Sequence, residues 1–452
     1  MQQYIEQINR MKLKLKLAKN ADRNLKVFGA DSHRYTVNPP LSPKEITMFE
    51  TQYGIQLPDC YKAFVTLFGN GGVSYQNSAA GPFYGIFPFG KELNCLSDNP
   101  QKSLKLDCRI YPGMTDEYWK EFSKTIEEDD ISDEEYEELR DTIFGGLLPI
   151  GAQGCEYSHA IVLNGQYAGK VVNMSEEFQK PHFSFEDTFL DWYERWLDEI
   201  ISGDLLQEGP YWFGYSMGGA EETLLNKFLS TDNERLKLDC VAGILDKKAI
   251  HKPVLEEIEK EYANNTGEVK NGLVEILTKF DYKRAKPYLL ELADTDLLNV
   301  CQFIWWYAKD RCREWAAFIK TNLARIDDVK TFRFCAYILE KAGQEDAETI
   351  IPFTKHRDKQ IRQVAYHRLG ELKHKSHYLD IFINGLQDPE HWVVHATLQA
   401  LDGLKDTRLL PYYKQIAERF PVEQDYILIN LNHRLKEYGL DNISVQELGS
   451  TN

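Results

Sequence analysis

The residue pattern that most directly suggests catalysis lies in the stretch FGYSMGGAEE, residues 213–222. Gly214, Ser216 and Gly218 match G-x-S-x-G, the sharp turn that presents the nucleophile in one class of serine hydrolases. That turn needs a parallel sheet before it and an acid and a histidine on the ends of later strands. The sequence that follows predicts helices only. We therefore favour a glycine- and aromatic-rich linker over residues 206–219 and keep hydrolysis through Ser216 as an alternative.

Histidines, acidic residues and cysteines also occur at spacings that can resemble metal sites. His391 and His395 share a helical face, but HWVVH lacks the glutamate of the zinc-protease motif and has no obvious third ligand. The run EEDDISDEEYEE at 127–138 lacks the alternating acids and the glycine of a calcium-binding loop. The eight cysteines contain no C-x-x-C pair, which is typical of buried thiols in a reducing cytoplasm. We expect no metal, no cofactor and no enzyme activity.

The charge of the chain indicates which partners it can bind. The 452 residues carry a formal net charge of −17, which disfavours nucleic acids and favours a basic partner. Residues 115–141 alone contain thirteen acidic and three basic residues. No apolar run approaches the roughly 18 residues of a membrane span, and residues 1–20 lack the apolar core of a secretory signal. We expect a cytoplasmic protein that binds neither nucleic acid nor membrane.

The first half of the chain predicts a mixed domain. Ser42 and Glu45 form a capping box for a helix that ends at Gly54. Short apolar runs at 81–90 and 146–174, separated by glycine turns, predict an antiparallel meander of strands. A second capping box opens a helix at Ser132, and the amphipathic segment 183–201 closes the domain. The fold class is α+β, with an antiparallel sheet and flanking helices.

Motifs spread over about residues 25–205 carry a resemblance to a known family. In chain order they are His33-Arg34-Tyr35, Asn38-Pro39-Pro40, Phe49-Glu50, Leu57-Pro58, Tyr61, Phe64, Gly69-Asn70-Gly71-Gly72, Gly81-Pro82-Phe83-Tyr84-Gly85, Leu148-Pro149-Ile150, Gln153-Gly154-Cys155 and SFEDTFLDWYERWL. Their order and spacing resemble the SUKH superfamily. The insertion VSYQNSAA before Gly81 and the long acidic segment 115–141 depart from the family pattern and could alter what that edge of the domain recognises.

The resemblance implies a binding module. Members of the family are best known as immunity proteins that neutralise bacterial polymorphic toxins, many of them nucleases, and fungal relatives regulate cell-wall synthesis. The family is not generally enzymatic.

The second half predicts stacked helices. Small residues recur about every 30 positions, at Ala242, Gly272, Ala336, Ala365 and Ala396, which is typical of a solenoid. The units 358–372 and 388–404 resemble short HEAT repeats. Such a stack offers a concave surface to protein partners.

Together these observations predict a basic helix at 1–24, a SUKH-like domain at 25–205 with an acidic insertion at 115–141, a linker at 206–219, HEAT-like repeats at 220–440 and a tail at 441–452. The predicted function is immunity, through binding of a cognate toxin or another basic protein. The alternative is a regulatory scaffold for endogenous proteins. The oligomeric state stays open. The predicted partner-binding residues are Glu127, Glu128, Asp129, Asp130, Asp133, Glu134, Glu135, Glu137 and Glu138.

Overall fold

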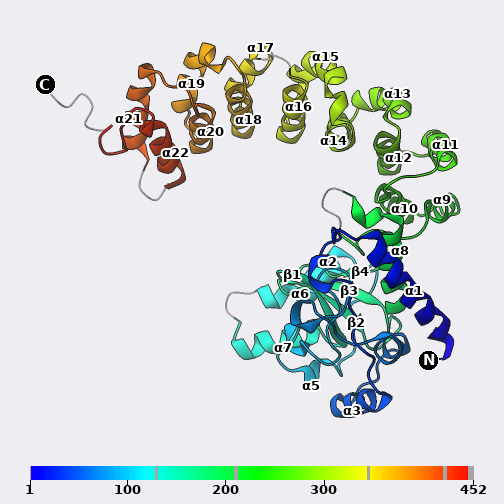
Figure 1. The fold of residues 1–452 in the computed structure, drawn as a ribbon. Helices are drawn as coiled ribbons and strands as arrows, with labels where there is room; N and C mark the ends of the chain where they lie inside the picture. Colours follow the sequence, from blue (N-terminus) through cyan, green and yellow to red (C-terminus); the bar gives the residue numbers. More distant parts are fainter. Residues whose placement is uncertain (1, 128–130, 208–211, 344–346, 421–424, 446–452) are drawn as a thin grey trace. The chain divides into compact units, whose positions relative to one another are not determined.

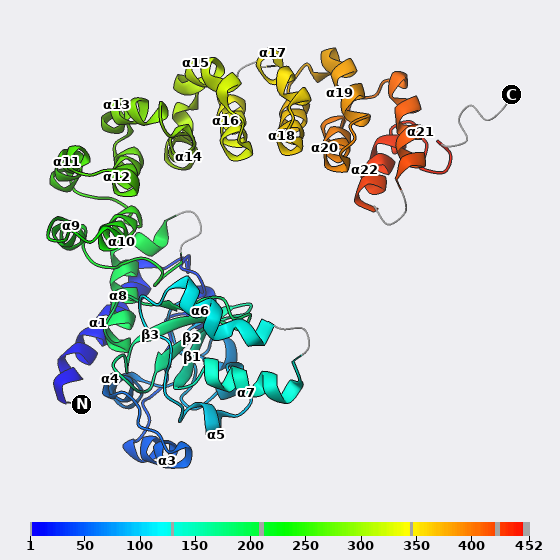
Figure 2. The same cartoon turned by 180° about the vertical axis from the view of Figure 1, so that it is seen from behind.

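A computed structural model describes residues 2–127, 131–207, 212–343, 347–420 and 425–445. The chain forms two compact units, Met1–Ile258 and Glu259–Asn452 (Figures 1 and 2). The first unit extends beyond residue 205, because it includes the 212–219 segment and the two helices that follow it.

The first unit is a mixture of helices and one sheet. Its helices are α1 (Ile5–Ala21), α2 (Ala30–His33), α3 (Pro43–Tyr53), α4 (Asp59–Ala63), α5 (Pro100–Ser103), α6 (Asp116–Ser123), α7 (Asp133–Ile143), α8 (Phe189–Ser202), α9 (Glu221–Leu229) and α10 (Glu234–Leu245), and α11 (Lys252–Glu261) lies at its end. Its strands are β1 (Leu147–Gly154), β2 (Tyr157–Val162), β3 (Val171–Ser175) and β4 (His182–Phe183).

The strands form an antiparallel sheet in the order β1-β2-β3-β4, which confirms the meander predicted over 146–174. The strand expected over 81–90 is not formed. Within that segment only Ile86 makes bridge contacts, with Ala79 and Gly151. The reason is backbone geometry, because Phe83 and Gly85 have φ of 53° and 100°, far from the extended conformation.

The sheet is buried on both faces, since successive residues of a strand point to opposite sides. Leu148, Ile161 and Val171 belong to a core that includes the buried aromatic residues of α8. Their neighbours in sequence, including Leu147 and Val172, belong to a second core with residues of α6 and α7. Helices α6 and α7, which lie within the acidic segment, therefore help to cover the second face.

The local signals for helix ends are confirmed. The Glu45 side chain accepts a hydrogen bond of 2.8 Å from the Ser42 N–H, and Gly54 ends α3 with φ of 62°. Ser132 and Glu135 form the second capping box at the start of α7.

Helix α1 packs against α8, and the Glu194 carboxylate of α8 contacts three polar side chains of α1. Glu194 of α8, although only 7% exposed, accepts from Arg10 Nε at 2.5 Å and Gln7 Nε2 at 3.2 Å, and pairs with Lys14 at 2.7 Å. Burial by itself would raise the pKa of Glu194, but these donors overcome burial and hold the pKa at about 2.

We expect Glu194→Gln to lower the free energy of unfolding by about 2–3 kcal/mol, because hydrogen bonds to charged groups contribute about that much and two cations lose their counter-ion. Asp198→Asn is the matched control. Asp198 also pairs with Lys14, at 2.7 Å, but is half exposed, so the loss should stay below about 1 kcal/mol.

Urea unfolding at pH 7 measures both variants, and equal losses would contradict the role given to Glu194. The contribution of Glu194 to the free energy of unfolding is fully present above the ordinary glutamate pKa of 4.5, and it is lost as pH falls toward 2.

The second unit is helical in its described part. After α11 its helices are α12 (Gly267–Phe280), α13 (Tyr282–Ala293), α14 (Leu297–Tyr307), α15 (Cys312–Asn322), α16 (Val329–Lys341), α17 (Ala347–Ile350), α18 (Lys359–Gly370), α19 (Leu379–Leu386), α20 (His391–Ala400), α21 (Leu410–Arg419) and α22 (Asp425–Lys436).

The even-numbered helices α12 to α22 pack side by side, each against the next one along the chain (Figure 1). Contacts join α12 to α14, α14 to α16, α16 to α18, α18 to α20 and α20 to α22. Three of the recurring small residues, Ala336, Ala365 and Ala396, are buried in this packing. In the described part of the chain, none of the helices combines the length and apolar character that crossing a membrane requires.

Candidate protein-binding surface

The structure explains the glycines of the hydrolase-like pattern by packing. Ser216 lies in an irregular segment before α9. The described part of this segment, residues 212–220, contains no strand. A Cβ on Gly218 would lie 2.0 Å from Nε of the buried Arg195. Gly214 has φ of 86°, and its Cβ would lie 3.3 Å from Trp192 Nε1. Both glycines let this segment lie directly on α8, so the pattern does not define a nucleophile turn.

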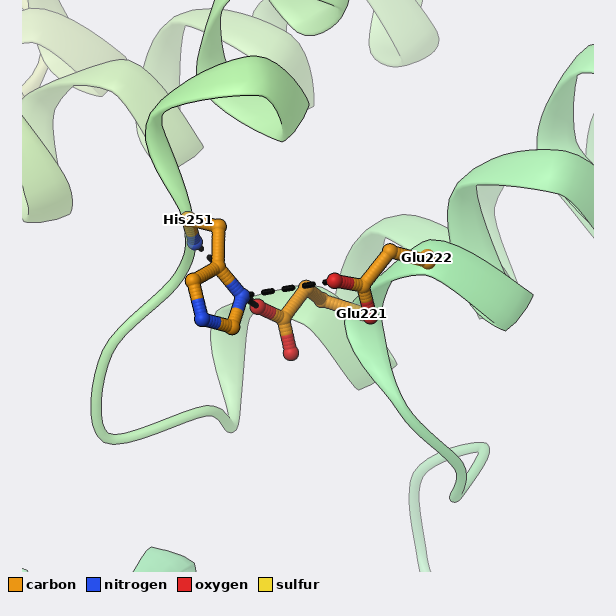
Figure 3. A group of neighbouring side chains, drawn as sticks. All are labelled: Glu221, Glu222 and His251. Carbon is orange, nitrogen blue, oxygen red and sulfur yellow. Dashed lines mark hydrogen bonds and ion pairs between the residues drawn. The ribbon is translucent and has the colours of Figure 1, made fainter.

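A group of two carboxylates and an imidazole lies where α9 begins (Figure 3). His251 Nδ1 is 2.5 Å from a Glu221 oxygen and 3.3 Å from a Glu222 oxygen. Among the described residues, these three side chains are the ones of a metal-binding type that come together, with their ligand atoms all within 4.8 Å of one another. Glu221 also accepts from the His251 backbone N–H at 3.1 Å. These bonds tie the segment before α11 to the start of α9 and account for the cluster without an ion.

The two histidines with zinc-like spacing have other contacts. His395 Nε2 lies 3.0 Å from Asn430 Nδ2 of α22, and His391 packs edge-on against Tyr426. Within the described parts of the chain, no third metal ligand joins them.

Those predicted partner-binding residues that lie on α7 belong to the layer that covers the second face of the sheet. Tyr136 and Leu139 of α7 pack inward, as do Trp119 and Phe122 of α6. Because the apolar residues occupy one side of each helix, the acidic residues take the other. We call the exposed acidic residues of these helices the acidic surface: Asp116, Glu117, Glu121, Asp133, Glu134, Glu135 and Glu138.

Not every predicted residue is equally available. Glu135 is engaged in capping α7, and Glu137 is half-buried. Glu138 is paired with Lys102 at 3.7 Å. Glu128, Asp129 and Asp130 lie outside the described residues, as does the side chain of Glu127. Asp133 and Glu134 are exposed and form no ion pair with any described residue.

Carboxylates also crowd one another around this surface. Burial, followed by the hydrogen bond and charge of Asp98, raises the pKa of Glu137. At the nearby end of β2, a hydrogen bond with Glu177 and its charge raise the pKa of Glu156. Like charges held this close repel, so a basic partner would relieve repulsion as well as add attraction.

Two buried histidines of this unit are uncharged. Burial lowers the pKa of His33 to about 4 against the opposing charges of Asp22 and Asp31. Burial also lowers the pKa of His159 to about 4, although a hydrogen bond with Asn173 opposes the shift.

A pocket of about 320 Å³ opens elsewhere on the first unit, and the sequence analysis did not find it. Lys26, Val27, Phe28, Phe83, Gln153, Trp196, Leu205, Gln207, Trp212 and Phe213 line it. The lining residues come from six separate segments, so no spacing in the sequence reveals them. The one signal in the sequence is the aromatic run around Trp212, which lies in the predicted linker at 206–219.

The fold is that of an α+β domain, in which helices cover both faces of a short antiparallel sheet. Residues 40–195 match the SMI1 / KNR4 family (SUKH-1), so this part of the chain is a SUKH-1 domain. The match lies inside the 25–205 range of the predicted resemblance. The family is known for toxin immunity proteins and is generally non-catalytic. No curated protein matched the chain.

Proposed function

We propose that this chain is an immunity protein that binds a cognate toxin domain with defined stoichiometry and blocks its active site or substrate groove. The SUKH-1 domain at residues 40–195 is the observation that carries this proposal. A fold without a catalytic constellation among its described residues fits inhibition by binding.

The acidic surface is the contact that we propose for a basic toxin. Its carboxylates lie on two helices that are held in place by the second core, so they form a pre-organised array. A nuclease needs a basic groove to bind phosphates, and an ordered row of carboxylates can occupy such a groove. Electrostatic steering would make association fast and sensitive to salt.

The helical unit would supply a second contact. The chain-order packing of α12, α14, α16, α18, α20 and α22 supports a HEAT-like solenoid, although the repeats are part of this proposal. If both units contacted one toxin, the linked sites would bind more tightly than either alone.

The test begins with capture of partners by the full chain from its native lysate at low salt, followed by mass spectrometry. We expect one basic, toxin-like protein in stoichiometric amount. Co-expression of that protein with the chain should restore growth that the protein alone abolishes. A spread of housekeeping proteins, with no toxic partner, would instead support the regulatory scaffold and overturn immunity.

A neutralised acidic surface should then weaken the complex. We expect Asp133→Asn, Glu134→Gln and Glu138→Gln together to lower affinity for the captured protein by about ten- to a hundredfold in low salt, with a flatter salt dependence. Glu135 stays unchanged because it caps α7.

The matched control removes the same three charges from exposed positions of the second unit: Glu268→Gln, Glu348→Gln and Glu418→Gln. Calorimetric titration at two salt concentrations measures both triple variants. An equal loss in the two would show that net charge, and not the acidic surface, governs binding.

A further inference from the structure

The pocket around Gln153 has the size of a site for one large side chain. Its volume of about 320 Å³ lies at the lower end of the roughly 300–1,000 Å³ of ligand clefts. A nucleotide-sized molecule would need more room.

The inner wall of this pocket is rigid and mostly aromatic. Phe83, Trp196 and Phe213 are each at least nine-tenths buried. Gln153 places an amide among these rings and is only 4% exposed. Rings fixed in this way lose little freedom when a ligand packs on them.

The Gln153 amide is held in one orientation by its neighbours. Its Nε2 donates to Asn173 Oδ1 at 2.9 Å, and its Oε1 accepts from the Tyr215 hydroxyl at 3.1 Å. An amide oxygen has two lone pairs, so Oε1 can accept one more hydrogen bond. A ligand ring that carries an N–H or O–H at its edge suits this wall.

Aromatic rings continue from the pocket across the surface. Phe28 and Trp212 at the rim are each 55% exposed, and their rings lie 5.7 and 5.9 Å from that of Phe83. Tyr84 extends the row from Phe28 to Tyr75, which is 56% exposed. A contiguous exposed aromatic patch around a pocket has the composition of a protein-binding hot spot. A small molecule that filled the pocket would leave most of these rings in water.

The charge at the pocket differs from that of the acidic surface. Lys26 is the charged residue in the lining, and it is exposed. It forms no ion pair with any residue in the described ranges. Lys26 is therefore an unpaired cation at the pocket. It can pair with an acidic residue of the partner that lies next to the side chain entering the pocket.

We propose that this pocket receives a tryptophan or tyrosine side chain of a protein partner, with an acidic residue of that partner beside Lys26. The ring packs between Phe83, Trp212 and Phe213, and its polar edge donates to Gln153 Oε1. This site goes beyond the proposed immunity function, because it is a second surface whose binding is apolar and tolerant of salt. It holds whether or not the partner is a toxin.

Three short probes test the site in the full chain by saturation-transfer NMR: N-acetyl-Trp-Glu-amide, N-acetyl-Trp-Lys-amide and N-acetyl-Leu-Glu-amide. We expect the Trp-Glu probe to bind in the millimolar range and about two- to fivefold more tightly than the Trp-Lys probe, which is the range of an exposed ion pair. The Leu-Glu probe should bind about tenfold more weakly, because it lacks the ring.

Substitutions locate the binding. Trp212→Ala should weaken the Trp-Glu probe about tenfold, and Lys26→Glu should reverse the preference between the Trp-Glu and Trp-Lys probes. Trp306→Ala is the matched control, because Trp306 is 49% exposed in the second unit and should leave binding unchanged.

Three results would overturn the proposal: equal binding of the Leu-Glu and Trp-Glu probes, equal weakening by Trp306→Ala and Trp212→Ala, or free indole that binds as tightly as the Trp-Glu probe. The last result would assign the pocket to a small aromatic molecule. None of these results depends on the acidic surface, so this test and the toxin test fail independently.

Discussion

Gly29→Ala is expected to lower the free energy of unfolding of the first unit by about 3 kcal/mol or more, the largest effect of any single substitution considered. Gly29 has φ of 77°, where an alanine is strained, and a Cβ there would lie 1.8 Å from the carbonyl oxygen of Phe83. Backbone strain and overpacking each cost about 1–3 kcal/mol. The clash is with backbone, so no side chain can rotate to relieve it.

The effect is measured as the midpoint of thermal unfolding, which should fall by about 6–12 °C for a domain of this size. Gly113→Ala separates strain from clash, because Gly113 has φ of 80° and its Cβ would meet nothing within 4 Å. It should cost about 1 kcal/mol. If the two variants lost equal stability, the close approach between Gly29 and Phe83 would play no part. Gly29 also follows Phe28, so a folded Gly29→Ala protein should bind the Trp-Glu probe less well.

Acidification from pH 7 to pH 5 is expected to destabilise the first unit by about 2 kcal/mol for each of the two uncharged histidines. In the folded chain the pKa of His33 and the pKa of His159 are each about 4, against 6.5 for an unperturbed histidine. Between these values the unfolded chain binds protons that the folded chain cannot. The contribution of the two neutral histidines to the free energy of unfolding is therefore complete above pH 6.5, and it is lost as pH falls toward 4.

Urea unfolding at pH 7, 6 and 5 measures this loss. His33→Gln and His159→Gln should each remove a contribution of about 2 kcal/mol between pH 7 and pH 5, even though each lowers stability at pH 7. Burial also lowers the pKa of His182, and both variants keep its contribution. The control pair His374→Gln and His377→Gln alters exposed histidines of the second unit and should leave the pH dependence of the first unit unchanged. An unchanged slope in the His33 and His159 variants would contradict the buried, uncharged state of these residues.

Much of the first unit follows from local sequence. Ser42, Ser132 and Gly54 specify where helices begin or end, because capping and positive φ depend only on a few neighbouring residues. Alternating apolar residues and glycine turns likewise specify the meander of β1, β2 and β3. The 81–90 segment has similar composition, yet positive φ at Phe83 and Gly85 prevents a strand. In the folded chain the Phe83 carbonyl lies against Gly29, which is more than fifty residues away in the sequence, and Gly85 lies against the adjacent Ala79.

The sequence by itself determined that the chain carries a SUKH-type domain, a strongly acidic segment and a helical second half, because composition, periodicity and motif order are local properties. Only the tertiary structure decided what the surfaces present. It left Glu137 half-buried and Asp133 exposed. It placed Gly218 of the predicted linker in close packing on Arg195. It also brought Lys26, Gln153 and Trp212 to one pocket. Side chains so far apart in the chain meet only through the packing of the whole unit, which no spacing in the sequence records.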